Sequence, residues 1–286
     1  MRAARRSVGP ILLPVLLGLY ASLVLRPAVA AEGYGQCRLF GQKATRHIAP
    51  VVPGQLTVLI NLPAVGEFDG DSPDSIRSGR EFCLGVNIAY RLGLDKLVLR
   101  NASFDSLVAG RNRDYDLALA LLSVRHRTHD LVAFSAPYAW DSYGVAVRAD
   151  ARIDAAGLRG VRVGTQIGTN VTTWAHDTLK IRRLSAFDDT GTMFTALAAG
   201  NVDAIITSLS VVLGQVGAAH GRFKVVGQFH EDTPIAAVLP LHSPQTRIIS
   251  RIIEDMRADG TLATLEQTYL APLWNSLKPS EIPVWH

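Results

Sequence analysis

The apolar positions of the chain follow two periods, one typical of strands and one typical of helices. Residues 56–60 (LTVLI) are apolar and largely β-branched, which predicts a strand, and a loop rich in Gly, Pro and Asp follows to residue 79. Residues 82–94 predict a helix, because apolar side chains recur at i, i+4 and i+8 and Gly93 ends the pattern. A strand at 96–101, a helix at 104–110 and a strand at 116–122 are expected next. This order predicts an α/β fold with a sheet covered on both faces.

The same order begins again after a strand at residues 143–150. The expected elements are strands at 160–166, 181–187 and 203–208 and helices at 170–179 and 192–200. Two stretches of the chain show the same order: a helix, a Gly, an Asp and a buried strand, followed by Ser123 in one and Ser210 in the other. Each Ser is the seventh residue after the Asp. Two βα lobes explain this repeat most simply. A last strand at 234–243 and two helices could complete either lobe; if they complete the first, the chain crosses between the lobes twice.

The first thirty residues predict a cleavable secretory signal peptide. Three arginines precede an apolar stretch that closes on the small-x-small residues 28–30 (AVA). A membrane anchor is the alternative, but Pro14 and Gly18 interrupt the stretch and Arg26 ends it, short of the ~20 residues that a span needs. We therefore expect cleavage after Ala30.

Removal of this peptide changes the charge of the chain. Of the 29 Lys and Arg residues, 4 belong to the peptide, so 25 remain against 25 Asp and Glu. The mature protein is formally neutral, and no basic field remains that would favour nucleic acid or an anionic membrane. Cys37 and Cys83 both remain in an expected oxidising compartment. They could bridge the N-terminal arm to the first helix, or they could be two buried free thiols.

Eight segments in a fixed order carry a resemblance to a known family. They include ASFDSLVAG (102–110), VAFSAPY (132–138), LRGVRVGTQIGT (158–169) and FTALAAGNVDAIITS (194–208), with Phe-Ser-x-Pro-Tyr and Gln-x-Gly-Thr turns. Over residues 55–284 the chain resembles the periplasmic solute-binding proteins of polar amino-acid ABC importers, family 3 of the extracellular solute-binding proteins. The resemblance implies a two-lobe clamshell of the type II periplasmic-binding-protein class, with a two-stranded hinge.

The resemblance also implies a division of the chain and a set of partners. We expect a signal peptide at 1–30, an N-terminal arm at 31–55, lobe 1 at 55–147 and 234–286, and lobe 2 at 148–233. The expected protein is a periplasmic monomer that closes over a small, carboxylate-bearing solute and presents it to an ABC permease in the inner membrane. Its chemistry is binding and not bond breaking, and we expect no cofactor and no metal.

One set of ligand-contacting positions follows the strand that ends at Ser123. The family pattern Ser-Ile-Thr-Pro-Glu-Arg supplies an Arg that holds the ligand carboxylate bidentately, whereas this chain reads SVRHRT. Counted without gaps, Thr128 takes the Arg position. A slip of one residue would make Arg127 the clamp, and Arg125 could also reach the cleft, so the sequence leaves the choice between them open.

The other expected contacts come from elsewhere in the chain. Thr169 and Asn170 stand at the start of a helix, where free backbone N–H groups suit an anionic group. Ser208 replaces the acidic residue that normally meets the ligand ammonium. Phe68 stands where relatives often carry an aromatic that stacks on the ligand, with core packing as the alternative. These changes favour a carboxylate or another anion-bearing solute over an ordinary α-amino acid.

Two other functions remain open. The chain could be an accessory periplasmic protein of a quinoprotein dehydrogenase system, because both an in-register Arg and the usual acidic residue are missing. It could also be a cyclohexadienyl-dehydratase-like enzyme, which needs a general acid of raised pKa facing the ligand; Asp141 and Glu67 are candidates between which the sequence does not choose. His126 and His129 lack the spacing of a metal motif, and we expect them to be surface imidazoles.

Overall fold

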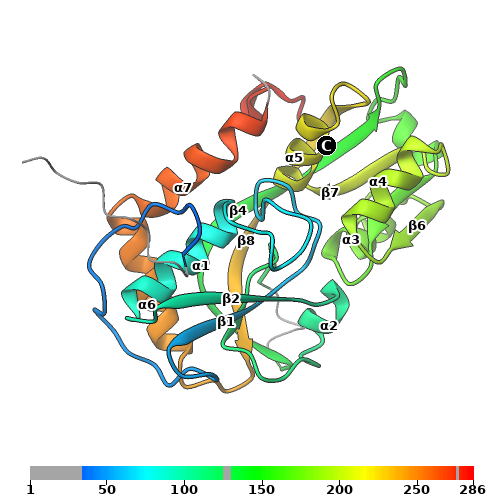
Figure 1. The fold of residues 1–286 in the computed structure, drawn as a ribbon. Helices are drawn as coiled ribbons and strands as arrows, with labels where there is room; N and C mark the ends of the chain where they lie inside the picture. Colours follow the sequence, from blue (N-terminus) through cyan, green and yellow to red (C-terminus); the bar gives the residue numbers. More distant parts are fainter. Residues whose placement is uncertain (1–33, 125–129, 275–276) are drawn as a thin grey trace, which may run out of the picture.

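The fold is that of a two-lobe clamshell built on one sheet. The computed structural model describes residues 34–124, 130–274 and 277–286. Its eight-stranded mixed sheet has the order β2-β1-β3-β8-β4-β7-β5-β6. The long antiparallel strands β4 (Val132–Arg148) and β8 (Phe223–Pro240) run through both halves and join them (Figure 1). Each half has its own helices and core, so the predicted α/β class with a two-stranded hinge is confirmed.

The first lobe surrounds the parallel strands that begin the chain. Its elements are β1 (Gln55–Ile60), β2 (Lys96–Asn101), β3 (Leu117–Ala118), α1 (Arg80–Arg91), α2 (Phe104–Val108), α6 (Thr246–Ala258) and α7 (Thr261–Tyr269). In α6 the fully buried side chains are Ile249, Ile252, Ile253 and Met256, which recur at the helical period and face the core. The apolar periodicity of this segment therefore explains both its helical state and its orientation.

The second lobe repeats the βα order on the other side of the hinge. Its elements are β5 (Val163–Gln166), β6 (Leu184–Phe187), β7 (Ala204–Ser208), α3 (Asn170–Asp177), α4 (Thr190–Ala198), α5 (Leu209–Ala218) and a short 3₁₀ helix at Gly157–Gly160. Strand β5 pairs in parallel with β6 and β7, whereas β7 is antiparallel to β4. The carboxyl ends of β5 and β7, and the helices that follow them, therefore face the junction with the first lobe.

Several elements differ from the sequence-based expectations. The expected strand at 116–122 is reduced to β3, because the backbone turns at Leu121, whose φ is 51°. The expected Pro-Tyr turn lies inside β4, where Pro137 pairs with Ala236 between two shifts of register. Strand β8 begins earlier than expected, at Phe223, and α5 follows β7 directly, although no helix was predicted there.

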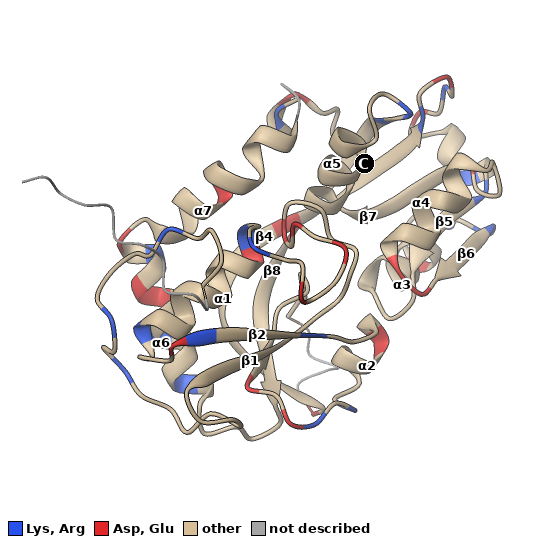
Figure 2. Ribbon diagram, in the orientation of Figure 1, with Lys and Arg blue, Asp and Glu red and all other residues tan. Residues whose placement is uncertain are grey.

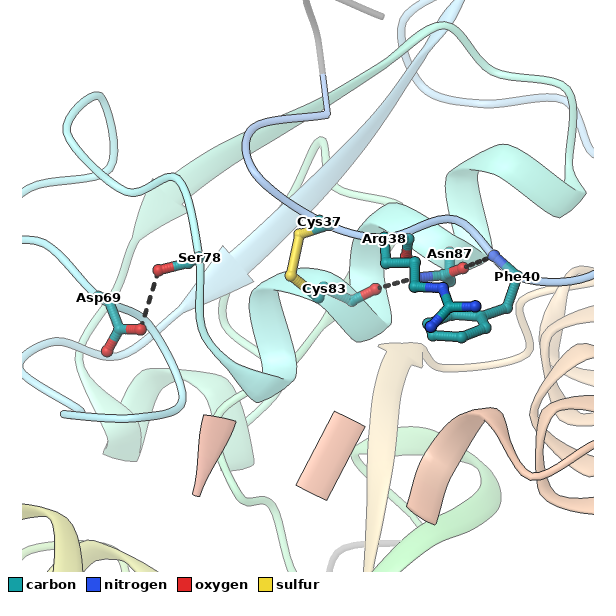
Figure 3. The surroundings of a disulfide bond; sticks show 7 residues. All are labelled: Cys37, Arg38, Phe40, Asp69, Ser78, Cys83 and Asn87. Carbon is teal, nitrogen blue, oxygen red and sulfur yellow. Dashed lines mark hydrogen bonds between the residues drawn. A yellow bond between two sulfur atoms is a disulfide. The ribbon is translucent and has the colours of Figure 1, made fainter. Parts of the chain in front are cut away.

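The N-terminal arm is held against α1 by a disulfide between Cys37 and Cys83. Figure 3 shows the amide of Asn87 beside this bond. Asn87 accepts a hydrogen bond from the backbone N–H of Phe40 at 2.8 Å and donates to the carbonyls of Arg38 and Cys83 at 3.0 and 2.9 Å. Of the two states that the sequence left open for these cysteines, the structure has the bridge.

The C-terminal segment contacts both lobes. Helices α6 and α7 pack on α1 in the first lobe. Two 3₁₀ helices follow at Ala271–Trp274 and Pro279–Glu281, and then Trp285 donates its backbone N–H to Gln228 of β8 and packs its ring on Phe229. The last residues therefore lie on the second lobe. The expected division instead placed all of 234–286 in the first lobe. Basic and acidic residues are both distributed along the ribbon of each lobe (Figure 2). None of the helices within residues 34–124, 130–274 and 277–286 is long and apolar enough to span a membrane.

Candidate functional site

A cleft lies between the lobes, where β4 and β8 cross from one to the other. It contains about 650 Å³ of space not filled by atoms, its open mouth included. The first lobe contributes Asn61, Phe104 and Ser123, among others, and the second contributes Gln166, Thr169 and Asn170. A cleft lined by both lobes, with polar groups set among apolar ones, is the usual place for a small-molecule site in a two-lobe fold.

Hydrogen bonds across the cleft hold the lobes together. Asn170 donates its side-chain N–H to the Ser123 hydroxyl at 2.8 Å, and Gln166 donates to the Asn61 side chain at 2.9 Å. Gly168 lies against Asp105 of the first lobe; its φ is +79°, and a Cβ there would lie 3.0 Å from the Asp105 Cα. A glycine is therefore required for this approach. The described residues form a closed arrangement, with both lobes in contact around the cleft.

The N-terminus of α3 points into the cleft and has uncapped amides. Thr169 is the N-cap residue, but its hydroxyl donates to the Gln166 carbonyl at 2.7 Å and makes no hydrogen bond to the helix. Trp174 fixes α3 from behind, because its ring packs between those of Tyr143 and Phe229, with centroids 4.9 and 4.8 Å away. The free N–H groups and the positive end of the helix dipole are suited to a carboxylate.

A cluster of carboxyl groups lies at the start of α1 and in the middle of β4, which together are called the floor of the cleft. Glu67 and Arg80 form a buried bidentate ion pair, with both N–O distances 2.8 Å. Glu81 accepts hydrogen bonds from the backbone N–H of Leu121 at 2.9 Å and from the Tyr138 hydroxyl. The Ser208 side chain lies near Asp141 and favours its ionised form. Glu81 and Asp141 both line the cleft.

Burial raises the pKa of both carboxyl groups that line the cleft. The pKa of Glu81 rises to about 7, because the side chain is desolvated and the Glu67 carboxylate is close, and Arg80 only partly offsets this. Desolvation raises the pKa of Asp141 to about 6, although the nearby Ser208 side chain opposes the shift. The protonated forms of these groups are therefore favoured in the folded protein relative to the unfolded chain.

We expect the free energy of unfolding to fall as the pH rises from about 4.5 to about 7. In this window the unfolded chain has lost the Glu81 proton while the folded protein still holds it, so rising pH stabilises the unfolded state, by about 3 kcal/mol for a shift of this size. Glu81→Gln keeps the acceptor for Leu121 and Tyr138 but cannot ionise. Urea unfolding of the wild type and the variant at several pH values tests this. The free energy of unfolding of the variant, relative to that of the wild type, should increase with pH, and a difference that does not change with pH would contradict the prediction.

The structure brings together part of the predicted ligand-binding set. Ser123, Thr169, Asn170 and Ser208 all line the cleft. Phe68 does not: its side chain is 2 % exposed and lies in the core of the first lobe, which agrees with the alternative of core packing. That Ser123, Thr169, Asn170 and Ser208 contact a ligand stays a prediction. Arg125, Arg127, Thr128 and the two histidines lie outside the described residues.

Sequence reasoning missed Glu81 as a cleft residue. An acidic residue in the first turn of a helix is common because it stabilises the helix dipole, so its sequence position carried no signal of a site. Asp141 was considered only as a general acid. Among the residues that the structure describes, no group of three or more His, Cys, Asp or Glu side chains is placed to hold a metal ion.

Comparison with known proteins adds a family and a fold. The chain matches the bacterial extracellular solute-binding proteins, family 3, over residues 68–272. It is 24% identical over 207 residues to the L-cystine-binding protein TcyJ of Escherichia coli (strain K12), covering 71% of this chain and 77% of that protein. Among solved structures, an ancestral arginine-binding protein bound to arginine has a TM-score of 0.66 at 24% identity, covering 76% of this chain and 98% of that one. The solute receptor for L-cysteine of Neisseria gonorrhoeae has a TM-score of 0.68 at 20% identity, covering 80% and 95%.

Proposed function

Because the chain belongs to family 3 of the bacterial extracellular solute-binding proteins, we propose that it is a periplasmic receptor that closes on a small amino-acid-like solute. The closed form then delivers the solute to an ABC importer. The observation that carries this proposal is the cleft between the lobes, with polar side chains from both lobes and hydrogen bonds across it. A solute bound there would join the two lobes and stabilise the closed form.

The solute carboxylate is proposed to bind at the start of α3. The amides of the first turn are not capped, and the side chains of Thr169 and Asn170 lie beside them in the cleft. Arg125 or Arg127 would complete this end of the site from the first lobe, as the resemblance implies. Such a site matches an amino acid or a related carboxylate, because one end holds an anion and the other polar side chains, set among apolar ones, are neutral or acidic.

A thermal-shift screen of residues 31–286 against amino acids, dicarboxylates and aromatic acids tests the receptor function. A solute at 100 times its dissociation constant should add about 2.7 kcal/mol to the free energy of unfolding. Calorimetry would then give the affinity. If no solute raised the melting temperature or gave heat of binding, the receptor proposal would fail, and a protein partner would become the better explanation.

Asn170→Ala is expected to weaken binding of the best solute at least tenfold. The substitution removes the side-chain amide, which donates to Ser123 across the cleft at 2.8 Å. The same amide is the polar group of this residue beside the proposed carboxylate position. Thr178→Ala, at the exposed far end of α3, is the matched control and should bind like the wild type. Calorimetry on the three proteins compares them, and equal affinities would place the solute away from the α3 N-terminus.

The raised pKa of the Asp141 carboxyl group in the cleft favours the second candidate, a cyclohexadienyl-dehydratase-like enzyme. A cleft carboxyl whose pKa is raised to about 6 could act as a general acid. We propose binding in preference, because the family is one of solute-binding proteins. Incubation of the protein with prephenate should give no product, and enzyme-dependent product that disappears in Asp141→Asn would favour catalysis.

A further inference from the structure

Residues 277–286, called the tail below, connect the two lobes in addition to β4 and β8. They continue from α7, which packs on α1 in the first lobe, and they end beside α5 of the second lobe (Figure 1). The chain matches its family only up to residue 272, so the tail lies outside the matched region. Membership of the family therefore does not explain what the tail does.

Hydrogen bonds hold the tail on β8, and Gln228 is at their centre. The backbone N–H of Gln228 donates to the Pro283 carbonyl at 2.9 Å, and its carbonyl accepts from the Trp285 N–H at 2.8 Å. Its side-chain amide donates to the carbonyls of Pro279 and Ile282 at 2.6 and 2.9 Å. Gln228 is 3% exposed, so little water competes for these hydrogen bonds. The tail is thus attached to one of the two strands of the hinge.

Apolar contacts fit the tail to the second lobe as well. Ile282 is 3% exposed and packs with Leu209 and Leu213 of α5. The Trp285 ring lies directly over Gly227 of β8. A Cβ at position 227 would be 2.2 Å from the indole ring, so only a glycine leaves room for it. The second lobe is therefore shaped to receive the tail at two places, one on α5 and one on β8.

The connection from α7 to the tail lies on the face of the hinge opposite the cleft. Neighbouring residues of a strand point to opposite faces of the sheet. On β4, Tyr143 lines the cleft, whereas Trp140 and Ser142 line a second hollow and Asp141 borders both. The second hollow contains about 960 Å³ of space not filled by atoms, its open mouth included, and Trp274 is part of its lining. Rotation about β4 and β8 that opens the cleft narrows the space on this opposite face.

The 3₁₀ helix Ala271–Trp274 fills part of that space and contacts both lobes. On the first lobe, Leu273 lies against Gly66, whose φ is +85°; a Cβ there would be 2.5 Å from the Leu273 Cδ1 atom. On the second lobe, Trp274 packs against the apolar cluster of α5 that includes Leu213. A body in contact with both lobes at the back of the hinge opposes their approach there, and the docked tail holds it in place.

We propose that the tail is a strap that holds the clamshell closed. While the strap is docked on β8, the hinge opens less, and a bound solute is retained longer. The coupling is reciprocal, because a solute that favours the closed arrangement also favours the docked strap. The effect on the hinge depends only on the contacts of the strap, whereas the effect on the solute rests on the proposed function.

Two variants release the strap from its two sides. Trp285→Ala removes the ring, and Gly227→Val fills the space that the ring needs. Gly160→Ala, in the same lobe, is the matched control, because its added Cβ meets no atom within 4 Å. Spin labels on cysteines at the exposed positions Arg111 and Asp177 measure the distance between the lobes without any solute. Both strap variants should shift this distance to longer values, and the control should not.

Calorimetry and displacement kinetics with the best solute of the thermal-shift screen test retention. Each strap variant should bind that solute about fivefold more weakly or less, and release it faster, because part of the coupling to the closed form is lost. If no solute binds to any of the proteins, the receptor function fails, while the distances between the spin labels still decide whether the strap acts on the hinge.

Faster hydrogen exchange of the Gln228 amide shows that a variant has released the tail. Wild-type or shorter distances in a released variant would overturn the strap. So would a variant that lowers only the free energy of unfolding and keeps the wild-type affinity, since the tail would then be a purely structural element. Circular dichroism checks that the variants are folded, and Trp285→Phe is the milder replacement should Trp285→Ala not fold.

Discussion

Replacement of Arg80 by Met is expected to lower the free energy of unfolding by about 3–5 kcal/mol. Arg80 and Glu67 are 8% and 1% exposed, and two hydrogen bonds of 2.8 Å join them. Removing the guanidinium leaves the Glu67 carboxylate in a site where water cannot solvate it. It also removes the charge that limits the pKa of Glu81, so the cluster must bind a further proton or unfold more easily. Urea unfolding at pH 7 measures the loss.

The double variant Arg80→Met/Glu67→Leu is the control for this prediction. If the loss comes from an unpaired buried carboxylate, removing that carboxylate as well should recover a large part of it, as is typical of buried ion pairs. Ser210 donates to Glu67 across the cleft at 3.2 Å, so recovery should remain incomplete. A single variant that loses less than about 1 kcal/mol, or a double variant that is less stable than the single one, would contradict the explanation.

Much of the fold was predictable because its elements are regular over their own length. The periodic apolar residues of α1 and α6 and the β-branched run of β1 meet the core in the expected orientation. The hinge was harder to predict, since β4 passes through Pro137 only because β8 accommodates two shifts of register there. Likewise the buried segment after β3 looks like a strand in sequence, yet it turns at Leu121, where its backbone N–H meets the Glu81 carboxylate.

The site was predictable where a local motif carries it. The Gln-x-Gly-Thr turn located Thr169 and Asn170, because the glycine and the helix start are neighbours in sequence. The acidic floor depends on tertiary contacts instead. Whether Glu81 is an exposed first-turn acid or a buried cleft acid depends on Tyr138 and Leu121, which lie 57 and 40 residues away. Asp141 likewise comes near Ser208 only through the pairing of β4 with β7.

Removal of the disulfide is expected to cost about 4 kcal/mol of unfolding free energy. The bond joins Cys37 to Cys83, which are 46 residues apart, and a loop of that length restricts the unfolded chain by about this amount in the chain-entropy account. The effect should also be local. The arm reaches α1 through the disulfide and through Asn87, which bonds Arg38 and Phe40 (Figure 3). Farther along, the backbone N–H groups of Ala44 and Arg46 donate to the carbonyls of Tyr90 and Arg91 at the end of α1. Without the bridge, those hydrogen bonds must hold the arm in place against its conformational entropy.

The variant Cys37→Ser/Cys83→Ser and the wild type under reducing conditions should therefore behave alike. Both should show the same fall in urea midpoint, and backbone amides of the arm, including Phe40, should exchange with solvent faster than those of α6. Asn87→Ala in the oxidised protein separates the Asn87 hydrogen bonds from the bridge: it should cost about 1–2 kcal/mol of unfolding free energy while the arm stays tethered. If reduction left both the midpoint and the exchange of the arm unchanged, the packing of the arm, and not the bridge, would be what holds it on α1.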